Sequence, residues 1–359
     1  MNQQNRLRRY LGDRTPHRPN NMNIFNDEKG KIANFDTVFR ETKAIHERNR
    51  DLTTSLRKLE VVEDEGNIKL YEKENDLLLP FSDWSLSQFC NLIGGVHVGY
   101  IKKCLERGKV DLALTNLREW MKDTQHSLAN RKEKDKHLFL RHDSERLNGI
   151  LRDRYTVLDD IEVLVFLRDL LPFRKEYVVQ SYYVSEELMN VRILQKDRMK
   201  VSDEDLFIGI NVWNSRVGRS SLNISIMVYK EVCTNGVIVQ KDKEEFYIQR
   251  HVGIDRDKFV YDFHRMMTRL PKTSKQLEEH ISKAIDTKLD YHELEFILTK
   301  FKAETQASDK AVEAVKREYQ KYGDNRWGLL NRITEVAQEY TLDQKENFEK
   351  FAGDFLLKY

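Results

Sequence analysis

The segment "VCTNGVIV" at residues 232–239 places a cysteine between two apolar, strand-like runs. A catalytic cysteine needs a neighbouring base and an electropositive, partly exposed pocket. His251 is the nearest histidine downstream, so a Cys233–His251 hydrolase is one hypothesis. The competing interpretation is a hairpin turn at Asn235-Gly236, because both residue types tolerate positive φ and cysteine is commonly buried. We favour the turn and predict no catalytic residue.

Metal and triphosphate chemistry have no supporting motif. The ten histidines form no HExxH pattern, and the five-residue spacing of His137 and His142 places them on opposite faces of a strand. The carboxylates in "YEKEND" are better explained as a solvated strand face than as metal ligands. The chain has no GxxxxGK[ST] loop, and "GGVHVG" lacks the lysine. We therefore expect neither a metal ion nor another cofactor.

Basic residues beside aromatic residues give a clearer chemical signal. They occur in the phrases "LRDRY", "NSRVGRSS", "MVYK" and "YIQRH", and the candidate residues are Arg152, Arg154, Tyr155, Arg216, Arg219, Lys230, Tyr247 and Arg250. Guanidinium groups bind phosphates bidentately. Aromatic rings stack on unpaired bases whatever their identity. The sequence therefore predicts that these residues bind a single-stranded nucleic acid.

The alternative is that the arginines are structural clamps. Arg152 and Arg154 have carboxylates close by in the sequence, at Asp153, Asp159 and Asp160, so we weigh clamp and phosphate contact equally for them. Arg216 and Arg219 have no acidic residue within their own loop. For those two arginines we favour phosphate contact.

The elements that must position these residues follow from periodicity and capping. Ser82 precedes a helical pattern, and Asp159 or Asp160 precedes another. Strand-like segments rich in β-branched and aromatic residues follow one another from Tyr177 onward. From residue 255 the chain reads as helices, with Pro271 near a boundary. The fold class is therefore α+β, an antiparallel sheet backed by helices with a C-terminal helical region.

We divide the chain into four parts by composition and pattern. They are a flexible basic tail (1–22), a mixed α/β N-terminal part (23–172), a β-rich core (173–254) and a helical C-terminal region (255–359). Within the helical region, Trp327, Leu330 and Ile333 fall on one helical face, which predicts a core or subunit interface.

The composition limits the class of protein and its expected location in the cell. The chain has 359 residues, of which 40% are hydrophobic and 33% charged, with a net charge of +2. It has no apolar run of about 20 residues and no apolar signal core, so we expect no membrane span and no secretion. Three cysteines without a CxxC pair argue against a disulfide framework. We therefore expect a cytoplasmic protein.

Several phrases together resemble one family. They are "LPFSDWSLSQFC" (79–90), "ILRDRYTVLDD" (150–160), "NSRVGRSSLNISIMVYKEVCTNG" (214–236) and "NRWGLLNRITEVAQ" (325–338). The chain resembles the phage/plasmid-like proteins that contain a domain of unknown function, over roughly residues 52–340. The resemblance implies a mobile-element origin and a host cytoplasm but supplies no reaction. At fold level, the order of sheet and helices is similar to that of the RecT/Redβ-like single-strand annealing proteins of phages.

The resulting functional hypothesis is a phage or mobile-element protein that binds single-stranded DNA or RNA without sequence preference. Strand annealing inside a homo-oligomer is an extension of this hypothesis. Two alternatives remain open: a phage-encoded protein that inhibits a host defence complex by binding it, and the Cys–His hydrolase. A salt-dependent titration with single-stranded and duplex DNA separates the first hypothesis from the others.

Overall fold

The computed structural model describes residues 35–130, 137–152, 154–171, 176–230, 235–239, 246–251, 253 and 255–358. The basic tail predicted for residues 1–22 lies outside these residues, as do Asp153 and Cys233. The described part of the chain is a mixed α+β structure with antiparallel sheets and a helical C-terminal region, as the sequence predicts.

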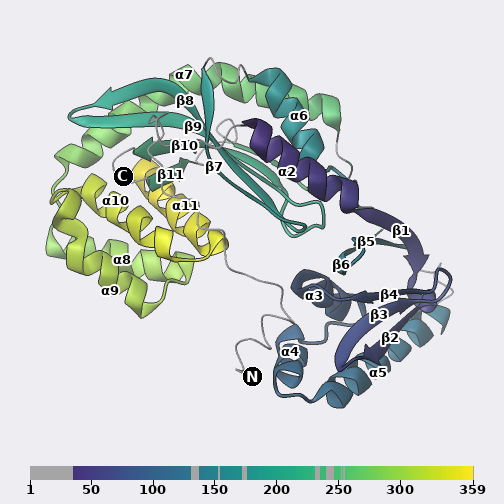
Figure 1. Ribbon diagram of the computed structural model, residues 1–359. Coiled ribbons are helices and arrows are strands. Elements are labelled where there is room, and N and C mark those ends of the chain that lie inside the picture. The colour runs from purple at the N-terminus through teal and green to yellow at the C-terminus, as the bar shows by residue number, and fades with distance from the viewer. Residues whose placement is uncertain are drawn as a thin grey trace.

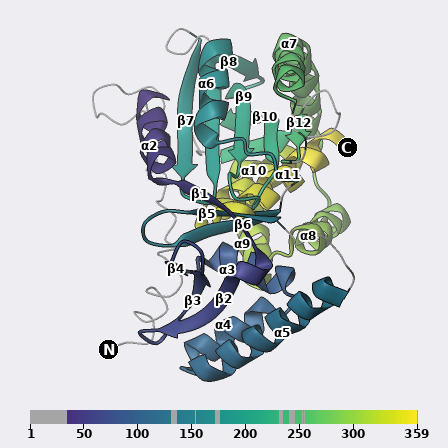
Figure 2. The ribbon, with the colours of Figure 1, turned by 90° about the vertical axis from the view of Figure 1, so that its right-hand side faces the viewer.

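An N-terminal lobe is built on a small antiparallel sheet with strand order β2-β3-β4. The strands are β2 (Leu59–Asp64), β3 (Asn67–Glu72) and β4 (Leu77–Pro80). The helices of the lobe are α3 (Asp83–Leu92), α4 (Val98–Glu106) and α5 (Val110–Asn130). Ser82 caps α3 by accepting a hydrogen bond from the Ser85 backbone N–H, as the sequence predicts. These elements gather at one end of the molecule (Figures 1 and 2).

A second three-stranded sheet lies between this lobe and the rest of the protein (Figures 1 and 2). Its strand order is β1-β5-β6, with β1 at Arg50–Ser55, β5 at His137–His142 and β6 at Leu147–Arg152. Apolar residues of β5 and β6 belong to the core of the N-terminal lobe. The chain enters this sheet from helix α2 (Phe35–Arg48) and leaves it toward α6 (Asp160–Leu170).

The largest sheet has six strands, all paired antiparallel, on the path β11-β10-β9-β8-β7 with β12 also paired to β10. The strands are β7 (Tyr177–Val184), β8 (Met189–Val201), β9 (Glu204–Asn214), β10 (Leu222–Lys230), β11 (Asn235–Val239) and β12 (Phe246–Gln249). The helices that follow are α7 (Arg256–Asp286), α8 (Tyr291–Thr305), α9 (Asp309–Glu318), α10 (Arg326–Val336) and α11 (Leu342–Lys358).

One face of the large sheet is apolar. Cross-strand partners such as Ile193, Ile210 and Ile226 share this face and are fully buried. Side chains of α2, α6 and the first half of α7 cover one end of the face, and the second half of α7 with α8 to α11 covers the other. Burial of this face supplies most of the core, since hydrophobic stabilisation scales with apolar area removed from water.

The opposite face carries buried polar residues. Asn190, Arg192, Asn211, Asn223 and Ser225 alternate with the apolar residues of β8, β9 and β10 and are each at most 9% exposed. Because a buried polar group without a partner is costly, this face must be satisfied by specific contacts. A smaller apolar cluster of Leu194, Phe207, Met227, Tyr229 and Ile238 lies on this face as well.

The edge strand β11 is covered by α11. A Cβ atom added to Gly353 of α11 would lie 1.9 Å from the carbonyl oxygen of Ile238, so only glycine permits this approach. The helix thereby blocks the open edge of the strand, where another chain could otherwise pair. α11 also brings Glu349 onto the polar face, where it meets Arg192.

Two local predictions need correction. Asn235 and Gly236 are not the turn: both are strand residues of β11, paired with Lys230 and Tyr229, and the connection lies at residues 231–234. Gly236 is absent from the positive-φ residues; a Cβ there would instead meet the Met227 methyl group at 2.9 Å. Pro271 does not mark a boundary, because α7 runs through it.

Gly353→Ala tests the contact between α11 and β11. In an open helix this change would stabilise by about 0.5–1 kcal/mol, but here the clash with the Ile238 backbone should destabilise by about 3 kcal/mol or more. Urea denaturation of Gly353→Ala beside Gln344→Ala, an exposed position of the same helix, measures the difference. A stabilised Gly353→Ala protein would show that α11 does not lie against the β11 backbone.

Candidate functional site

A buried arginine joins the sheets to one another. Arg141 of β5 is 1% exposed and forms a bidentate pair with Asp51 of β1, with two N–O distances of 2.8 Å. Its Nη1 lies 2.5 Å from Asp159 Oδ1 and also donates to the Arg216 carbonyl oxygen at 3.3 Å. Burial opposes the positive charge, but the two carboxylates together hold the Arg141 pKa above its usual value.

Asp159 connects this arginine to two helices. It is the N-cap of α6, where its side chain and that of Glu162 form a reciprocal capping box. Its second oxygen lies 3.2 Å from Nδ1 of His46 on α2. The sequence predicted a cap at Asp159 or Asp160, and the structure assigns the cap to Asp159.

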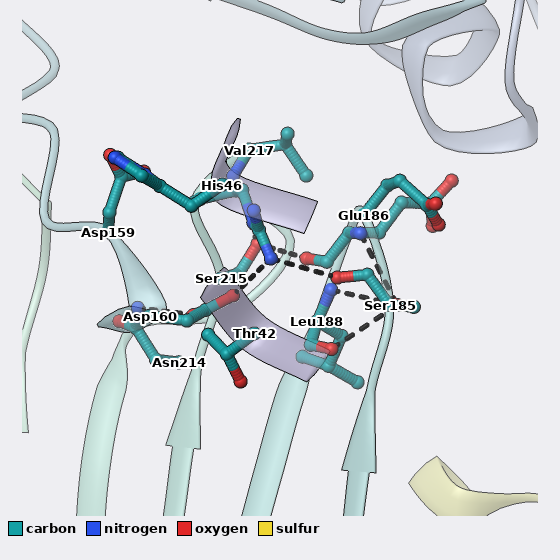
Figure 3. A network of polar contacts seen from close by, with 12 residues as sticks. Thr42, His46, Asp159, Asp160, Ser185, Glu186, Leu188, Asn214, Ser215 and Val217 are labelled. Atoms are coloured by element: carbon teal, nitrogen blue, oxygen red, sulfur yellow. Dashed lines mark hydrogen bonds and ion pairs between the residues drawn. The ribbon is translucent and has the colours of Figure 1, made fainter. Parts of the chain in front are cut away.

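Asp160 and Arg216 form a second, fully buried pair beside the first. Arg216 Nη2 lies 2.8 Å from Asp160 Oδ2, and both side chains are 0% exposed. Arg216 Nη2 also donates to the Ser185 carbonyl oxygen at 3.2 Å, and Asn214 donates to Asp160 Oδ1 at 2.7 Å. Figure 3 shows Asp160, Asn214 and Ser185 close together where strands of the large sheet end.

Tyr155 connects the turn after β6 to the loop after β9, which contains Arg216. Its hydroxyl donates to the Ser215 carbonyl oxygen at 2.8 Å, and its ring stacks on His251 with centroids 5.0 Å apart. Burial raises the pKa of Tyr155, whereas burial lowers the pKa of His251 to about 4. The stack is therefore neutral near pH 7 and acts as packing.

The loop that follows β9 is also held by the N-terminal lobe. The Val217 carbonyl oxygen accepts hydrogen bonds from Trp84 Nε1 and Gln88 Nε2, both at 2.9 Å. A Cβ atom at Gly149 would come within 2.8 Å of the Val217 side chain, so β6 needs glycine there. The phrases at 79–90, 150–160 and 214–221, far apart in the sequence, thus meet in one network.

Arg216 is where the phosphate hypothesis fails in this structure. A side chain that is 0% exposed and paired with Asp160 cannot reach a phosphate in solvent. This is the clamp interpretation, with a partner from outside the loop. The absence of an acidic residue within "NSRVGRSS" did not predict an unpaired arginine, because Arg216 pairs with Asp160 from a distant part of the sequence.

Arg219 and Lys230 are paired as well. Arg219 lies 3.0 Å from Glu187 and 2.8 Å from Asp343, and its side chain is 32% exposed. Lys230 lies 2.6 Å from Glu204 and is 12% exposed. Because Lys230 ends β10 at the end opposite β12, it is also remote from Arg250.

The two tyrosines predicted to stack on bases make contacts within the protein. The Tyr155 ring stacks on His251, and the Tyr155 hydroxyl group donates to the Ser215 carbonyl oxygen. Tyr247 is 7% exposed and packs on Phe259 with ring centroids 5.2 Å apart. The Tyr247 ring is therefore buried in the core, and His251 covers one face of the Tyr155 ring.

Arg152, Arg154 and Arg250 differ from the other candidates. All three are exposed, and none has an ion pair among the described residues. Their backbones are neighbours, because Thr156 N–H donates to the His251 carbonyl oxygen at 2.8 Å and Tyr155 N–H donates to the Arg152 carbonyl oxygen at 2.9 Å. We call these three residues the arginine corner.

A cavity of about 520 Å³ lies on the polar face of the large sheet. Trp213 of β9 and Asn223 of β10 form its floor, α11 contributes one wall, and α3 with α4 of the N-terminal lobe contributes another. The loop that bears Arg219 completes its rim. Trp213 Nε1 is buried and has no hydrogen-bond partner among the described residues.

Only one member of the proposed Cys–His pair lies among the described residues, since Cys233 does not. The described residues that flank it, Lys230 and Asn235, pair with each other at one end of β10. His251 follows β12, which pairs with the other end of β10 at Leu222, about 26 Å away at about 3.3 Å per residue. His251 is also only 4% exposed. This arrangement does not support a shared catalytic site.

Metal ligands do not gather in the part of the chain that the structure describes. There, no group of three or more His, Cys, Asp and Glu side chains could hold a metal ion. Within the same residues, no helix has the length and apolar character needed to cross a membrane.

Sequence reasoning missed Arg141, Asp51 and the Arg192–Glu349 pair. Arg192 and Glu349 lie 157 residues apart, form two N–O contacts of 2.9 and 2.5 Å, and are buried. The signal that could have found Arg192 is its place in "MNVRIL", a charged residue inside an otherwise apolar strand. Such a residue needs a buried partner.

Arg216→Met tests the clamp. It leaves the buried Asp160 carboxylate without its cation and should destabilise by about 3–5 kcal/mol. The matched change Arg219→Met removes a partly exposed pair and should cost about 1 kcal/mol or less. Chemical denaturation of both variants decides between them; equal losses would mean that Arg216 is not the buried clamp described above.

His251 predicts a pH dependence of stability. Its folded-state pKa is about 4, against 6.5 for an ordinary histidine. The unfolded chain therefore takes up the proton first, so stability is complete above about pH 6.5 and falls by about 3 kcal/mol as the pH drops toward 4. His251→Phe keeps the ring and removes the titration, so its unfolding free energy should fall less over that range. Parallel curves for parent and variant would refute a buried neutral His251.

Comparison with known proteins identifies the family but no relative. Neither a curated protein nor a solved structure matched the chain. A family model described as "Domain of unknown function (DUF932)" matches residues 148–351, from β6 to within α11. The expected extent of the resemblance, from about residue 52, is thus wider at its N-terminal end than the match. Because the match covers more than half of the chain, the protein belongs to the DUF932 family.

Proposed function

We propose that this protein binds single-stranded nucleic acid through its phosphate backbone at the arginine corner. The observation that supports this most directly is the contrast among the basic residues predicted to bind. Arg216, Arg219 and Lys230 are neutralised by carboxylates, whereas Arg152, Arg154 and Arg250 are exposed without an ion pair in the described chain. The corner therefore presents three positive charges that have no carboxylate partner in the described part of the chain.

Contacts connect the corner to the buried network. The backbone hydrogen bond from Thr156 to His251 joins its two segments, and the Tyr155 ring between them stacks on His251. The Tyr155 hydroxyl group donates to the loop that the Arg216–Asp160 pair holds. The three arginines are therefore presented by backbone segments that lie side by side.

Arginine suits this ligand for two reasons. Its planar guanidinium group binds phosphate bidentately, and it also stacks on unpaired bases. Phosphate contacts carry little sequence information, so binding should tolerate any sequence. We extend the proposal to a phage or plasmid origin, which rests on the resemblance of the phrases quoted above. We also extend it to strand annealing in a homo-oligomer, which rests on the similar order of sheet and helices in the RecT/Redβ-like proteins.

Alanine substitution at the corner tests the proposal. Arg152→Ala, Arg154→Ala and Arg250→Ala should each weaken binding to single-stranded DNA of any base composition. Each lost phosphate contact should also flatten the plot of log affinity against log salt by about 0.7. Stability should change by no more than about 0.5 kcal/mol, because the side chains are exposed.

Arg107→Ala is the matched control, an exposed arginine at the end of α4 in the N-terminal lobe. It should leave both affinity and salt slope unchanged. Binding should be measured by fluorescence anisotropy with single-stranded and duplex oligonucleotides. The proposal fails if the parent protein binds neither at low salt, or if the corner variants bind like Arg107→Ala.

A further inference from the structure

The polar cavity has an unusual balance of charge. Its lining contains three cations, Lys102, Arg219 and Lys350, and four carboxylates, Asp83, Glu187, Asp343 and Glu346. Each cation already has an acidic partner within the lining, at N–O distances between 2.5 and 3.0 Å. The cavity therefore offers no surplus positive charge to a phosphate, although it is strongly polar.

The groups between these ion pairs suit a flat, neutral, hydrogen-bonding molecule. Two indole rings line the cavity: Trp84 belongs to α3 of the N-terminal lobe, and Trp213 belongs to the large sheet. Asn223, Asn347 and Ser220 contribute amide and hydroxyl groups that both donate and accept. A volume of about 520 Å³ falls in the usual range of small-molecule sites.

The lining of the cavity holds a buried donor without an acceptor. Trp213 Nε1 has no hydrogen-bond partner in the described chain, and the residue is 4% exposed. Because native proteins rarely leave buried donors unpaired, this group points to an acceptor supplied from outside the chain.

We infer that the cavity binds a nucleobase. A base is planar and neutral near pH 7, it stacks on aromatic side chains, and its ring nitrogen and carbonyl atoms accept hydrogen bonds from an indole N–H. The inference rests on the proposed nucleic-acid binding: phosphates stay at the arginine corner while an unpaired base enters the cavity. The loop at 214–221 connects the two places, because Gly218 approaches Tyr155 and the next residue, Arg219, lines the cavity.

Calorimetric titration of the full chain with deoxyadenosine tests this inference, with 2-deoxyribose 5-phosphate as the comparison probe. The nucleoside should bind and the sugar phosphate should not. Trp213→Phe keeps an aromatic ring but removes the N–H, so it should weaken nucleoside binding by about threefold to tenfold. Trp120→Phe, on the exposed surface of α5, should leave it unchanged.

Asn347→Ala provides a second variant at an exposed position of α11, in case Trp213→Phe does not fold. It should also weaken nucleoside binding. Equal binding of the sugar phosphate, or identical nucleoside affinity in Trp213→Phe, Asn347→Ala and the parent, would overturn the inference. If oligonucleotides bind through the arginine corner but deoxyadenosine does not bind at all, the inference fails and the proposed function stands.

Discussion

Burial of the Arg141 guanidinium is the constraint on which the arrangement of the sheets depends. A charge removed from water to this degree is tolerated only with carboxylates and hydrogen bonds around it. Arg141 contacts Asp51 of β1, Asp159 at the start of α6, and the Arg216 carbonyl oxygen in the loop after β9. The Arg141 side chain thus fixes the position of the six-stranded sheet relative to the β1-β5-β6 sheet.

The neighbouring contacts extend this constraint to the surface. The Asp160–Arg216 pair secures the loop from inside, while Tyr155 and Val217 secure it from the sides. The segments that emerge from this network are those that carry the arginine corner and one rim of the cavity. A buried electrostatic scaffold therefore positions exposed basic groups that have no ion pair among the described residues.

Local features of the fold were predictable from the sequence because they depend on neighbours in the chain. Ser82 and the acidic pair at 159–160 mark helix starts, and alternation marks the strands of the large sheet. Trp327, Leu330 and Ile333 pack in the core as their helical spacing predicts. The hairpin of β10 and β11 was also predictable, but its turn was placed at Asn235-Gly236, where both residues instead pair within β11 and Gly236 has no positive φ.

The site was less predictable because ion pairing is a tertiary property. Nothing near Arg216 in the sequence reveals Asp160, and nothing near Arg192 reveals Glu349. The same limit applies to Tyr155 and Tyr247, whose rings are buried by residues distant in the chain. Basic and aromatic composition singled out Arg152, Arg154, Arg216 and Arg219, but it could not separate the buried side chain of Arg216 from the exposed ones of Arg152 and Arg154.

Hydrogen exchange with and without a saturating single-stranded oligonucleotide tests the central claim most directly. The claim is that the arginine corner, held by the buried network, is the surface that meets nucleic acid. The account predicts slower exchange in the segments 147–156 and 246–251 when the oligonucleotide is bound, with α8 and α9 unaffected. Protection confined to other elements, or none at saturation, would contradict it.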